Sequence, residues 1–405
     1  MANQIVIIGG GAAGFFCAAN IHAPSDTNII LLERSQKFLS KVRISGGGRC
    51  NVTHNMDSIS RMIKCYPRGA QFLKKAFARF FVPDTIEWFA QRGVSLKVEP
   101  DGRMFPITDN SETIASALMR AAIDNNVQLR LGQHVTSVKP EGNQFVISIK
   151  GHKDIWADKV VIAAGGFPKL DMFDWLAPLG HTIVPPVPSL FTFKIPRHPI
   201  TQLMGLSVPY ASVKILGTKL QTEGPVLITH WGLSGPAVLK ASAYGALELA
   251  ASNYKFLAQV NWLAHFNEDS FREHLQQYRI EHPSQRIHNY SAQPLPKRLW
   301  AMFLMLAEID SELRWADLPA KQLNKLAKLV TALQLQVSGK STFKDEFVTA
   351  GGVQLTEIDG HTMQSKLHPG VYFAGEIMNI DGITGGFNFQ NAWTSGFIAA
   401  RSCSQ

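Results

Sequence analysis

Residues 4–14 read Gln4-Ile5-Val6-Ile7-Ile8-Gly9-Gly10-Gly11-Ala12-Ala13-Gly14. The β-branched apolar run at the start is typical of a buried parallel strand, and the residues after the glycines have helix-compatible composition. Gly9, Gly11 and Gly14 fit G-x-G-x-x-G, where the glycines serve in turn a tight turn, a close approach to a pyrophosphate, and packing of helix on strand. The stretch therefore predicts a strand, a turn and a helix whose N-terminal amides face a phosphate group.

A carboxylate follows at the expected distance. Residues 28–33, Asn-Ile-Ile-Leu-Leu-Glu, read as a second buried strand that ends in Glu33. This position is near the roughly 20-residue spacing of a ribose-binding acid, so we expect Glu33 to accept hydrogen bonds from ribose hydroxyls. Its charge also disfavours a ribose 2′-phosphate. The two motifs together predict FAD or NAD at this site rather than NADP.

Composition limits the class of protein. The chain has 405 residues, of which 45% are hydrophobic and 18% charged, as expected for two or three globular domains. No apolar run reaches the ~18 to 20 residues of a membrane span, and the start lacks the basic residues of a signal peptide. The four cysteines have no C-x-x-C spacing, so we expect neither a disulfide framework nor a metal site. We therefore expect a cytoplasmic protein.

The net charge of +9 raises nucleic acid or an anionic membrane as a partner. Basic residues are dispersed, however, and no arginine-rich arm is present. We therefore expect a small-molecule substrate rather than nucleic acid, with part of the charge serving a pyrophosphate and an acidic or carbonyl-bearing substrate.

A second glycine-rich stretch lies between Lys41 and Thr53 and contains Ser45-Gly46-Gly47-Gly48-Arg49-Cys50-Asn51. Three consecutive glycines make a poor helix or strand interior, so this backbone is free to present N–H groups to a ligand. The alternative is a flexible linker, but the basic residues on both sides and the Cys-Asn that follows favour a ligand-binding loop.

These motifs resemble the signature of a family of bacterial FAD flavoproteins, often labelled NAD(FAD)-utilising dehydrogenases, with aminoacetone-oxidase-like and bile-acid-reductase-like members. The resemblance covers essentially the whole chain, and it fixes the family better than the substrate. Further matching stretches are Gly102-Arg103-Met104-Phe105-Pro106, Ala163-Ala164-Gly165-Gly166, residues 229–237, residues 349–353, and residues 375–391.

The resemblance implies non-covalently bound FAD. Val135 is expected to place a backbone amide against the adenine, and the small residues that end the strand at 158–166 are expected to let backbone pass close to the cofactor. The expected FAD contacts are Gly9, Gly11, Ala12, Ala13, Gly14, Glu33, Arg34, Lys41, Ser45, Gly46, Gly47, Gly48, Arg49, Cys50, Asn51, Val135, Ala163, Ala164, Gly165, Gly375, Glu376, Asp381, Gly386, Phe387, Asn388 and Gln390.

The middle of the chain changes character. Pro185, Pro186 and Pro188 interrupt the pattern, and short strands followed by helical segments are predicted after them. Cofactor motifs return only near the C-terminus, where a strand at 370–376 is followed by a turn and a helix. The predicted fold is therefore α/β, a Rossmann-like FAD-binding domain in two parts (1–190 and 343–405) interrupted by an insert (191–342), β-rich first and helical second.

Smaller elements are also predicted. Helical spacing over residues 70–93 indicates two helices separated by Pro83. Asp109 or Asn110 is expected to cap a helix over 112–124. The C-terminal helix is expected to begin near the flavin N1/C2=O edge, where its dipole would stabilise the negative charge of the reduced ring.

We expect an FAD-dependent oxidoreductase that transfers hydride between flavin N5 and a small organic substrate or a nicotinamide. No second G-x-G-x-x-G follows a strand, so either NAD(P)H binds transiently, or a substrate reduces the flavin and oxygen or a quinone reoxidises it. The open alternatives are a peroxide-producing amine oxidase, an NAD(P)H-dependent enone reductase, a flavin-dependent RNA-modifying enzyme, and a flavin-binding protein without catalysis. Oligomeric state also stays open.

Two residues are candidates for a catalytic role. Cys50 lies where flavin chemistry could reach it, and Arg49 beside it could lower its pKa and favour the thiolate. A space-filling role beneath the ring is the alternative that we favour, because no partner cysteine lies nearby in sequence. His230, beside Trp231 in a glycine-rich turn, could line a substrate pocket or serve the structure.

Overall fold

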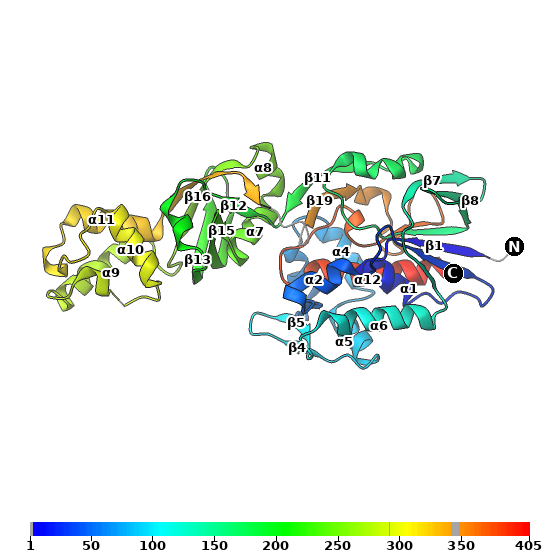
Figure 1. Cartoon of the computed structure of the whole chain (residues 1–405), viewed down its shortest axis with the longest axis horizontal. Coiled ribbons are helices and arrows are strands. Elements are labelled where there is room, and N and C mark those ends of the chain that lie inside the picture. The colour runs from blue at the N-terminus through cyan, green and yellow to red at the C-terminus, as the bar shows by residue number, and fades with distance from the viewer. Residues whose placement is uncertain (1–2, 291, 342–347) are drawn as a thin grey trace. The chain divides into compact units, whose positions relative to one another are not determined.

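The computed structural model describes residues 3–290, 292–341 and 348–405. Contacts between residues divide the chain into two compact units, Met1–Ser189 with Lys344–Gln405, and Leu190–Phe343. Figure 1 shows the elements of both units, coloured from blue at the N-terminus to red at the C-terminus. No described helix is long and apolar enough to cross a membrane. Within the same residues, no cluster of three or more His, Cys, Asp or Glu side chains is arranged to hold a metal ion.

The first unit is built on a five-stranded parallel sheet. Its strands are apolar because helices cover both faces of such a sheet, and Val6, Ile7 and Leu31 are fully buried. The C-terminal part of the chain contributes an edge strand beside the central ones. The order is β20 (Val371–Phe373), β10 (Lys159–Ile162), β1 (Gln4–Ile8), β2 (Asn28–Leu32) and β6 (Gln128–Arg130). The predicted α/β class with a Rossmann-type sheet is confirmed.

Two helices from opposite ends of the chain pack together on this sheet. They are α1 (Ala12–Ala18) and α12 (Phe387–Cys403). Gly396 allows the contact, because a Cβ there would lie 2.6 Å from the carbonyl oxygen of Ala13. The predicted helix near residue 112 is α6 (Ser111–Asp124), and Asn110 is the residue that caps it, accepting from the Glu112 amide at 2.9 Å.

Smaller elements complete the first unit. Residues 70–93 contain two helices, as predicted, and Pro83 lies in the first turn of the second helix, where its missing N–H costs nothing, rather than in the break between them. The helices are α2 (Ser40–Gly48), α3 (Ile59–Met62), α4 (Ala70–Phe77) and α5 (Val82–Ala90). Two antiparallel sheets contain β3 (Thr53–His54), β5 (Arg103–Pro106) and β4 (Leu96–Val98), and β7 (Val135–Glu141), β8 (Gln144–Ile149) and β9 (Ile155–Ala157).

The proline-rich segment is a strand. We expected Pro185, Pro186 and Pro188 to interrupt regular structure, but β11 (Ile183–Ser189) pairs antiparallel with β19 (Val348–Val353). The register shifts between Val184 and Val187, so the first two prolines lie in a bulge rather than in the ladder. A bulge tolerates proline because no ladder hydrogen bond is required there.

The second unit contains a seven-stranded sheet and a group of helices that share one apolar core. The strand order is β17 (Leu333–Ser338), β16 (Lys255–Asn261), β13 (Ser207–Ile215), β14 (Gln221–Thr229), β15 (Gly232–Ser234), β12 (Thr192–Lys194) and β18 (Lys340–Ser341). The helices are α7 (Pro236–Tyr244), α8 (Ala246–Ala251), α9 (Glu268–Glu281), α10 (Lys297–Leu306) and α11 (Ala320–Thr331).

Candidate cofactor site

The three motif glycines have different surroundings. A Cβ on Gly9 would lie 2.3 Å from the Ala163 carbonyl oxygen, and one on Gly14 would lie 1.9 Å from the Gly9 oxygen. Around Gly11, by contrast, a Cβ would meet no described atom within 4 Å. Gly9 and Gly14 are therefore needed by the fold, whereas Gly11 borders open space at the N-terminus of α1. This is the arrangement in which helix amides can hold a phosphate group.

Glu33 lies beside this turn, at the end of β2. One of its carboxylate oxygens accepts from the Gly10 amide at 2.8 Å, and the other accepts from the Ser35 amide at 2.7 Å. Each carboxylate oxygen has a second lone pair, so the half-buried group can still accept ribose hydroxyls. The Gln133 amide donates to the Glu33 carbonyl at 2.8 Å, which brings the start of β7, with Val135, to the same side of the sheet.

A third backbone segment approaches the α1 N-terminus from the C-terminal part of the chain. Gly375 has a φ of +76°, and a Cβ there would lie 2.8 Å from the Ala13 Cβ. Its amide donates to Ser395 Oγ at 2.8 Å, which ties it to α12. Gly165, three residues after the end of β10, also has a φ of +76° and borders open space among the described atoms. Three strand ends thus converge on one cradle of small residues, as expected for a close approach of cofactor and backbone.

The loop Ser45–Asn51 is a compact turn that begins within the range of α2, because the backbone is not helical at Ser45, Gly46 and Gly47. Gly46, Gly47 and Gly48 have φ values of +59°, +71° and +84°. The Ser45 carbonyl accepts from the amides of Arg49 and Cys50, so these two N–H groups are used inside the loop. Of the three glycines, Gly47 and Gly48 border open space among the described atoms, whereas a Cβ on Gly46 would meet Phe105 and Asn51. Gly47 and Gly48 are therefore the part of the loop backbone that we expect to face a ligand.

Cys50 is fully buried and has a φ of +62°. Burial raises the pKa of its thiol to about 12, and a hydrogen bond with Ser45 opposes that shift. The Arg49 guanidinium points elsewhere, to Glu99 at 2.6 Å and to Asp109 at 3.5 Å. The expectation that Arg49 would stabilise a Cys50 thiolate is therefore wrong. No described cysteine forms a disulfide, and a buried neutral thiol fits the space-filling role.

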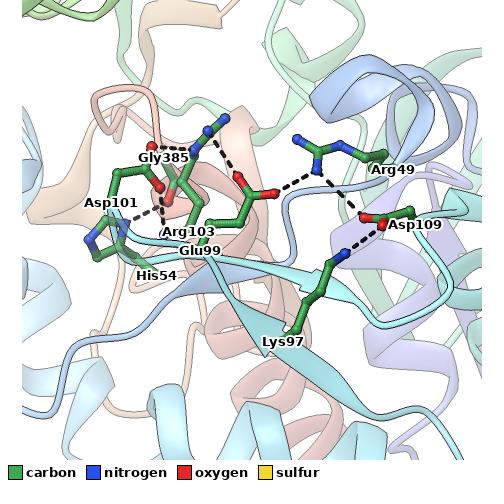
Figure 2. Close-up of polar contacts among 8 residues, drawn as sticks. All are labelled: Arg49, His54, Lys97, Glu99, Asp101, Arg103, Asp109 and Gly385. Carbon is green, nitrogen blue, oxygen red and sulfur yellow. Dashed lines mark hydrogen bonds and ion pairs between the residues drawn. The ribbon is translucent and has the colours of Figure 1, made fainter. Parts of the chain in front are cut away.

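Figure 2 shows the ion-pair network that holds this loop. Glu99 joins two cations, accepting from Arg49 at 2.6 Å and from Arg103 at 3.1 Å. The Arg49 guanidinium lies 4.0 Å from the centroid of the buried Phe105 ring. That ring in turn abuts Gly46, where a Cβ would lie 2.9 Å from it. The network therefore holds the loop in place on the side where it contacts Glu99 and Phe105.

The same loop is joined to the start of α12. With its amide oriented to satisfy both neighbours, Asn51 accepts from the Gly386 amide and donates to the Thr53 carbonyl, each at 3.0 Å. His54 Nδ1 lies 3.1 Å from the Gly385 carbonyl oxygen (Figure 2), and its ring stacks on Phe387 with centroids 4.8 Å apart. Residues from two distant motifs thus build one wall of the site.

Side chains after β20 brace the loop that precedes α12. Asp381 is fully buried, pairs with Arg68, and accepts from Ser189 Oγ at 2.8 Å. Burial raises the pKa of Asp381, and the Arg68 guanidinium opposes this shift. Asn388 closes the loop through two hydrogen bonds with Gly382, at 2.8 and 3.0 Å.

The buried Gln390 amide is also engaged. It bonds with the hydroxyls of Thr53 at 2.6 Å and Thr394 at 3.1 Å, and with Thr85. With Asp381 and Asn388 braced in the same way, the backbone at the start of α12 is the better candidate for a ligand contact than these side chains.

Thr349 Oγ1 is one of several buried side-chain atoms that have no hydrogen-bond partner within the described part of the chain. It lies next to Glu376, which accepts from the Thr349 amide at 2.9 Å and from Lys41 Nζ at 3.0 Å. A buried hydroxyl without a partner is costly, and a polar cofactor group would satisfy it. Together with the open spaces beside Gly11, Gly47 and Gly165, this donor set fits a dinucleotide.

The remaining predicted residues are less informative. Arg34 is exposed, Ala12 is the first residue of α1, and the Ala164 backbone lies beside Gly9. His230 is exposed in the second unit, where its ring contacts Trp231 with centroids 3.8 Å apart. A catalytic role for His230 stays a prediction.

Sequence reasoning did not single out Arg68, Glu99, His54 or Thr349. Arg68 and Asp381 are 313 positions apart, and no local pattern signals such a pairing. The available clue was Asp381, the single acid in the turn over residues 381–386, because a carboxylate that becomes buried needs a cation or several donors.

The family described as HI0933-like protein Rossmann domain matches residues 3–402. The chain is 31% identical to the ribosomal RNA dihydrouridine synthase of Escherichia coli, over 98% of this chain and 96% of that protein. It is 27% identical to the 3-dehydro-bile acid delta(4,6)-reductase of Clostridium scindens, over 100% of this chain and 99% of that protein.

The fold is also that of a solved dehydrogenase. The 3-ketosteroid-delta4-(5alpha)-dehydrogenase of Rhodococcus jostii matches with a TM-score of 0.53 and 14% identity, over 100% of this chain and 97% of that one. The family match covers nearly every residue, and the glycine cradle lies within it. The chain therefore belongs to the HI0933-like Rossmann family and is an FAD-dependent oxidoreductase.

Proposed function

We propose that the chain reduces the C5=C6 double bond of a uracil base in ribosomal RNA, with FAD as the hydride carrier. The observation that carries the proposal is the end-to-end similarity to the Escherichia coli ribosomal RNA dihydrouridine synthase. Identity of 31% over 98% of the chain extends well beyond the cofactor motifs. The alignment therefore spans the residues outside the FAD site, where an enzyme meets its substrate, as well as the cofactor motifs.

The charge distribution also supports an RNA substrate. Residues 190–343 contain 16 Lys and Arg and 10 Asp and Glu, so this unit holds +6 of the net +9. Dispersed basic residues alone favoured a small molecule. The excess positive charge is, however, concentrated in the unit without cofactor motifs. This favours RNA over a small molecule, because RNA binding depends on neutralising phosphates.

The chemistry suits the site. Reducing a C=C bond conjugated to a carbonyl adds a hydride to one carbon and a proton to the other, and FAD, once reduced by a nicotinamide, would supply the hydride. Gly11 and the first amides of α1 would hold its pyrophosphate, and Glu33 its ribose. The start of α12 would lie at the pyrimidine end of the flavin, where helix amides stabilise negative charge.

The proton donor is a separate question. The Cys50 thiol is protonated at neutral pH but fully buried, so it is poorly suited to donate to a substrate. The exposed imidazole of His230 stays a candidate, and a transiently bound reduced nicotinamide is the proposed electron donor.

A second candidate function is the reduction of a small conjugated enone. It is favoured by the 27% identity to the 3-dehydro-bile acid delta(4,6)-reductase, again over the whole chain. The two candidates share the same bond chemistry and differ in the size and charge of the substrate, so a direct comparison of substrates separates them.

The test uses holoenzyme and NADPH or NADH, with three substrates in parallel: ribosomal RNA from a strain that lacks the gene, a 3-keto-4-ene steroid, and aminoacetone. Nucleoside mass spectrometry of the RNA should find dihydrouridine only when enzyme and nicotinamide are both present. Steroid reduction without any dihydrouridine would favour the second candidate. Peroxide release with aminoacetone alone would contradict both.

A further inference from the structure

The seven-stranded sheet of the second unit has one covered and one open face. Val213 and Ile215 of β13 are buried in the same core as Ala237 and Ala241 of α7, and α7 lies against the sheet in Figure 1. Lys214, between the two buried residues, is exposed. Alternation along each strand therefore separates an apolar face under helices from a face in contact with solvent.

A row of amide and ammonium groups crosses this open face. Lys214 pairs in register with Gln221 of β14 on one side and with Gln259 of β16 on the other, and Gln259 pairs with Gln334 of β17. Paired residues in neighbouring strands point to the same face, roughly 4.8 Å apart per strand. Four hydrogen-bonding side chains thus stand in line, and none of them bonds to another side chain or to backbone in the described part of the chain.

The rest of the open face is of similar character. Lys255 of β16 lies opposite Ser338 of β17. Leu257, two positions along β16, is 40% exposed, and Tyr210, in the bulged part of β13, is 70% exposed. Glu223 of β14 is the acid among these strand residues. The face therefore offers cations, amides and some exposed apolar and aromatic surface together.

The positive charge of the second unit is concentrated in the part that forms this sheet. Residues 190–261 and 333–341 contain seven Lys and Arg against two Glu. The helical residues 262–332 contain nine Lys and Arg against eight Asp and Glu. A sheet face with more lysines than acids, and with side-chain amides that form no other hydrogen bond in the described residues, is complementary to RNA, whose backbone carries phosphates with sugar hydroxyls between them.

We propose that the open face formed by β14, β13, β16 and β17 is the surface that docks RNA. Lys214 and Lys255 bind phosphates, and the amides of Gln221, Gln259 and Gln334 bind sugar hydroxyls and base edges. This inference rests on the proposed function, because it names where the RNA substrate of that function is held. It assigns the face to RNA rather than to a second copy of the chain.

The experiment measures binding of FAD-loaded protein to a fluorescein-labelled RNA stem-loop by anisotropy, across a series of salt concentrations. The test variant is Lys214→Gln with Lys255→Gln. The matched control, Lys150→Gln with Lys153→Gln, removes two exposed lysines from the first unit. A further variant, Gln259→Ala with Gln334→Ala, removes amides without changing charge. Bound-flavin absorbance and the melting temperature confirm that each protein is folded and loaded.

Removing two phosphate contacts should weaken RNA binding roughly tenfold near 0.1 M salt and reduce the slope of log Kd against log salt by about 1.4 to 2. The control should bind like the wild type, and the amide variant should bind more weakly with an unchanged slope. Test and control variants with equal affinities and slopes would overturn the docking face while leaving RNA reduction intact. A wild-type protein that binds no RNA at low salt would overturn the proposed function itself, and loss of a dimer in the test variant would assign the face to a second copy.

Discussion

The contrast between Gly11 and Gly14 gives a direct test of the cofactor cradle. A Cβ on Gly11 would meet no described atom within 4 Å, and the backbone there is extended, with φ of −92° and ψ of −165°. An alanine at Gly11 should therefore leave the fold intact. At Gly14 a Cβ would lie 1.9 Å from the Gly9 carbonyl oxygen, so the same substitution should force β1 and α1 apart.

The expected magnitudes differ accordingly. Gly11→Ala should place a methyl group where the pyrophosphate binds and cost one charge-assisted hydrogen bond or more, about 1.5 to 3 kcal/mol. That corresponds to a Kd for FAD raised roughly ten- to a hundredfold. Gly14→Ala should instead destabilise the protein by about 1 to 3 kcal/mol, the cost of overpacking.

The assay has two readouts. Flavin fluorescence quenching on titration of apoprotein gives the Kd for FAD, and urea unfolding of the same apoprotein gives its stability. The expected result is a cofactor defect without a stability defect for Gly11→Ala, and a stability defect for Gly14→Ala. If Gly11→Ala bound FAD as tightly as the wild type, the assignment of this open space to the pyrophosphate would be refuted.

Four further outcomes are expected. Glu33→Ala should loosen FAD by roughly 1 to 3 kcal/mol, measured by the same titration; an unchanged Kd would remove Glu33 from the site. Cys50→Ser should keep FAD and at least a tenth of the flavin reduction rate in stopped flow, a loss below ~1.4 kcal/mol, whereas a thousandfold loss with FAD bound would make the thiol catalytic. Arg68→Met should lower the urea stability by about 3 kcal/mol, because it leaves Asp381 buried without its cation, and adding Asp381→Asn should recover part of it; no loss in the single variant would argue against the pair. Burial lowers the pKa of His181, so the unfolded state binds more protons and stability should fall as the pH drops below about 6.5; His181→Gln should lose that part of the pH dependence, and equal pH slopes in both proteins would contradict it.

The parts of the site that the sequence reveals are those set by local geometry. Gly14 is required by its contact with Gly9, within one strand, turn and helix, and Glu33 follows at the end of the next strand. Such short-range constraints appear as spacing in the sequence. The α/β class follows from the same elements, because apolar strands that alternate with helices form a parallel sheet.

The parts that the sequence hides depend on tertiary contacts. The Arg68 and Asp381 pair joins positions 313 apart, and spacing gives no sign of it. Arg49 stood next to Cys50 in sequence and suggested a thiolate, yet its side chain points to Glu99 instead. The prolines at 185 and 186 suggested a break, but a bulge in the β11 and β19 pair accommodates them.

The central claim is that reduced enzyme passes its hydride to RNA. The most direct measurement pre-reduces the holoenzyme without oxygen and then mixes it with ribosomal RNA from a strain that lacks the gene. The oxidised-flavin absorbance should return, and one dihydrouridine should form for each flavin reoxidised. Flavin that stays reduced with this RNA, yet is reoxidised by a conjugated enone or only by oxygen, would contradict the claim.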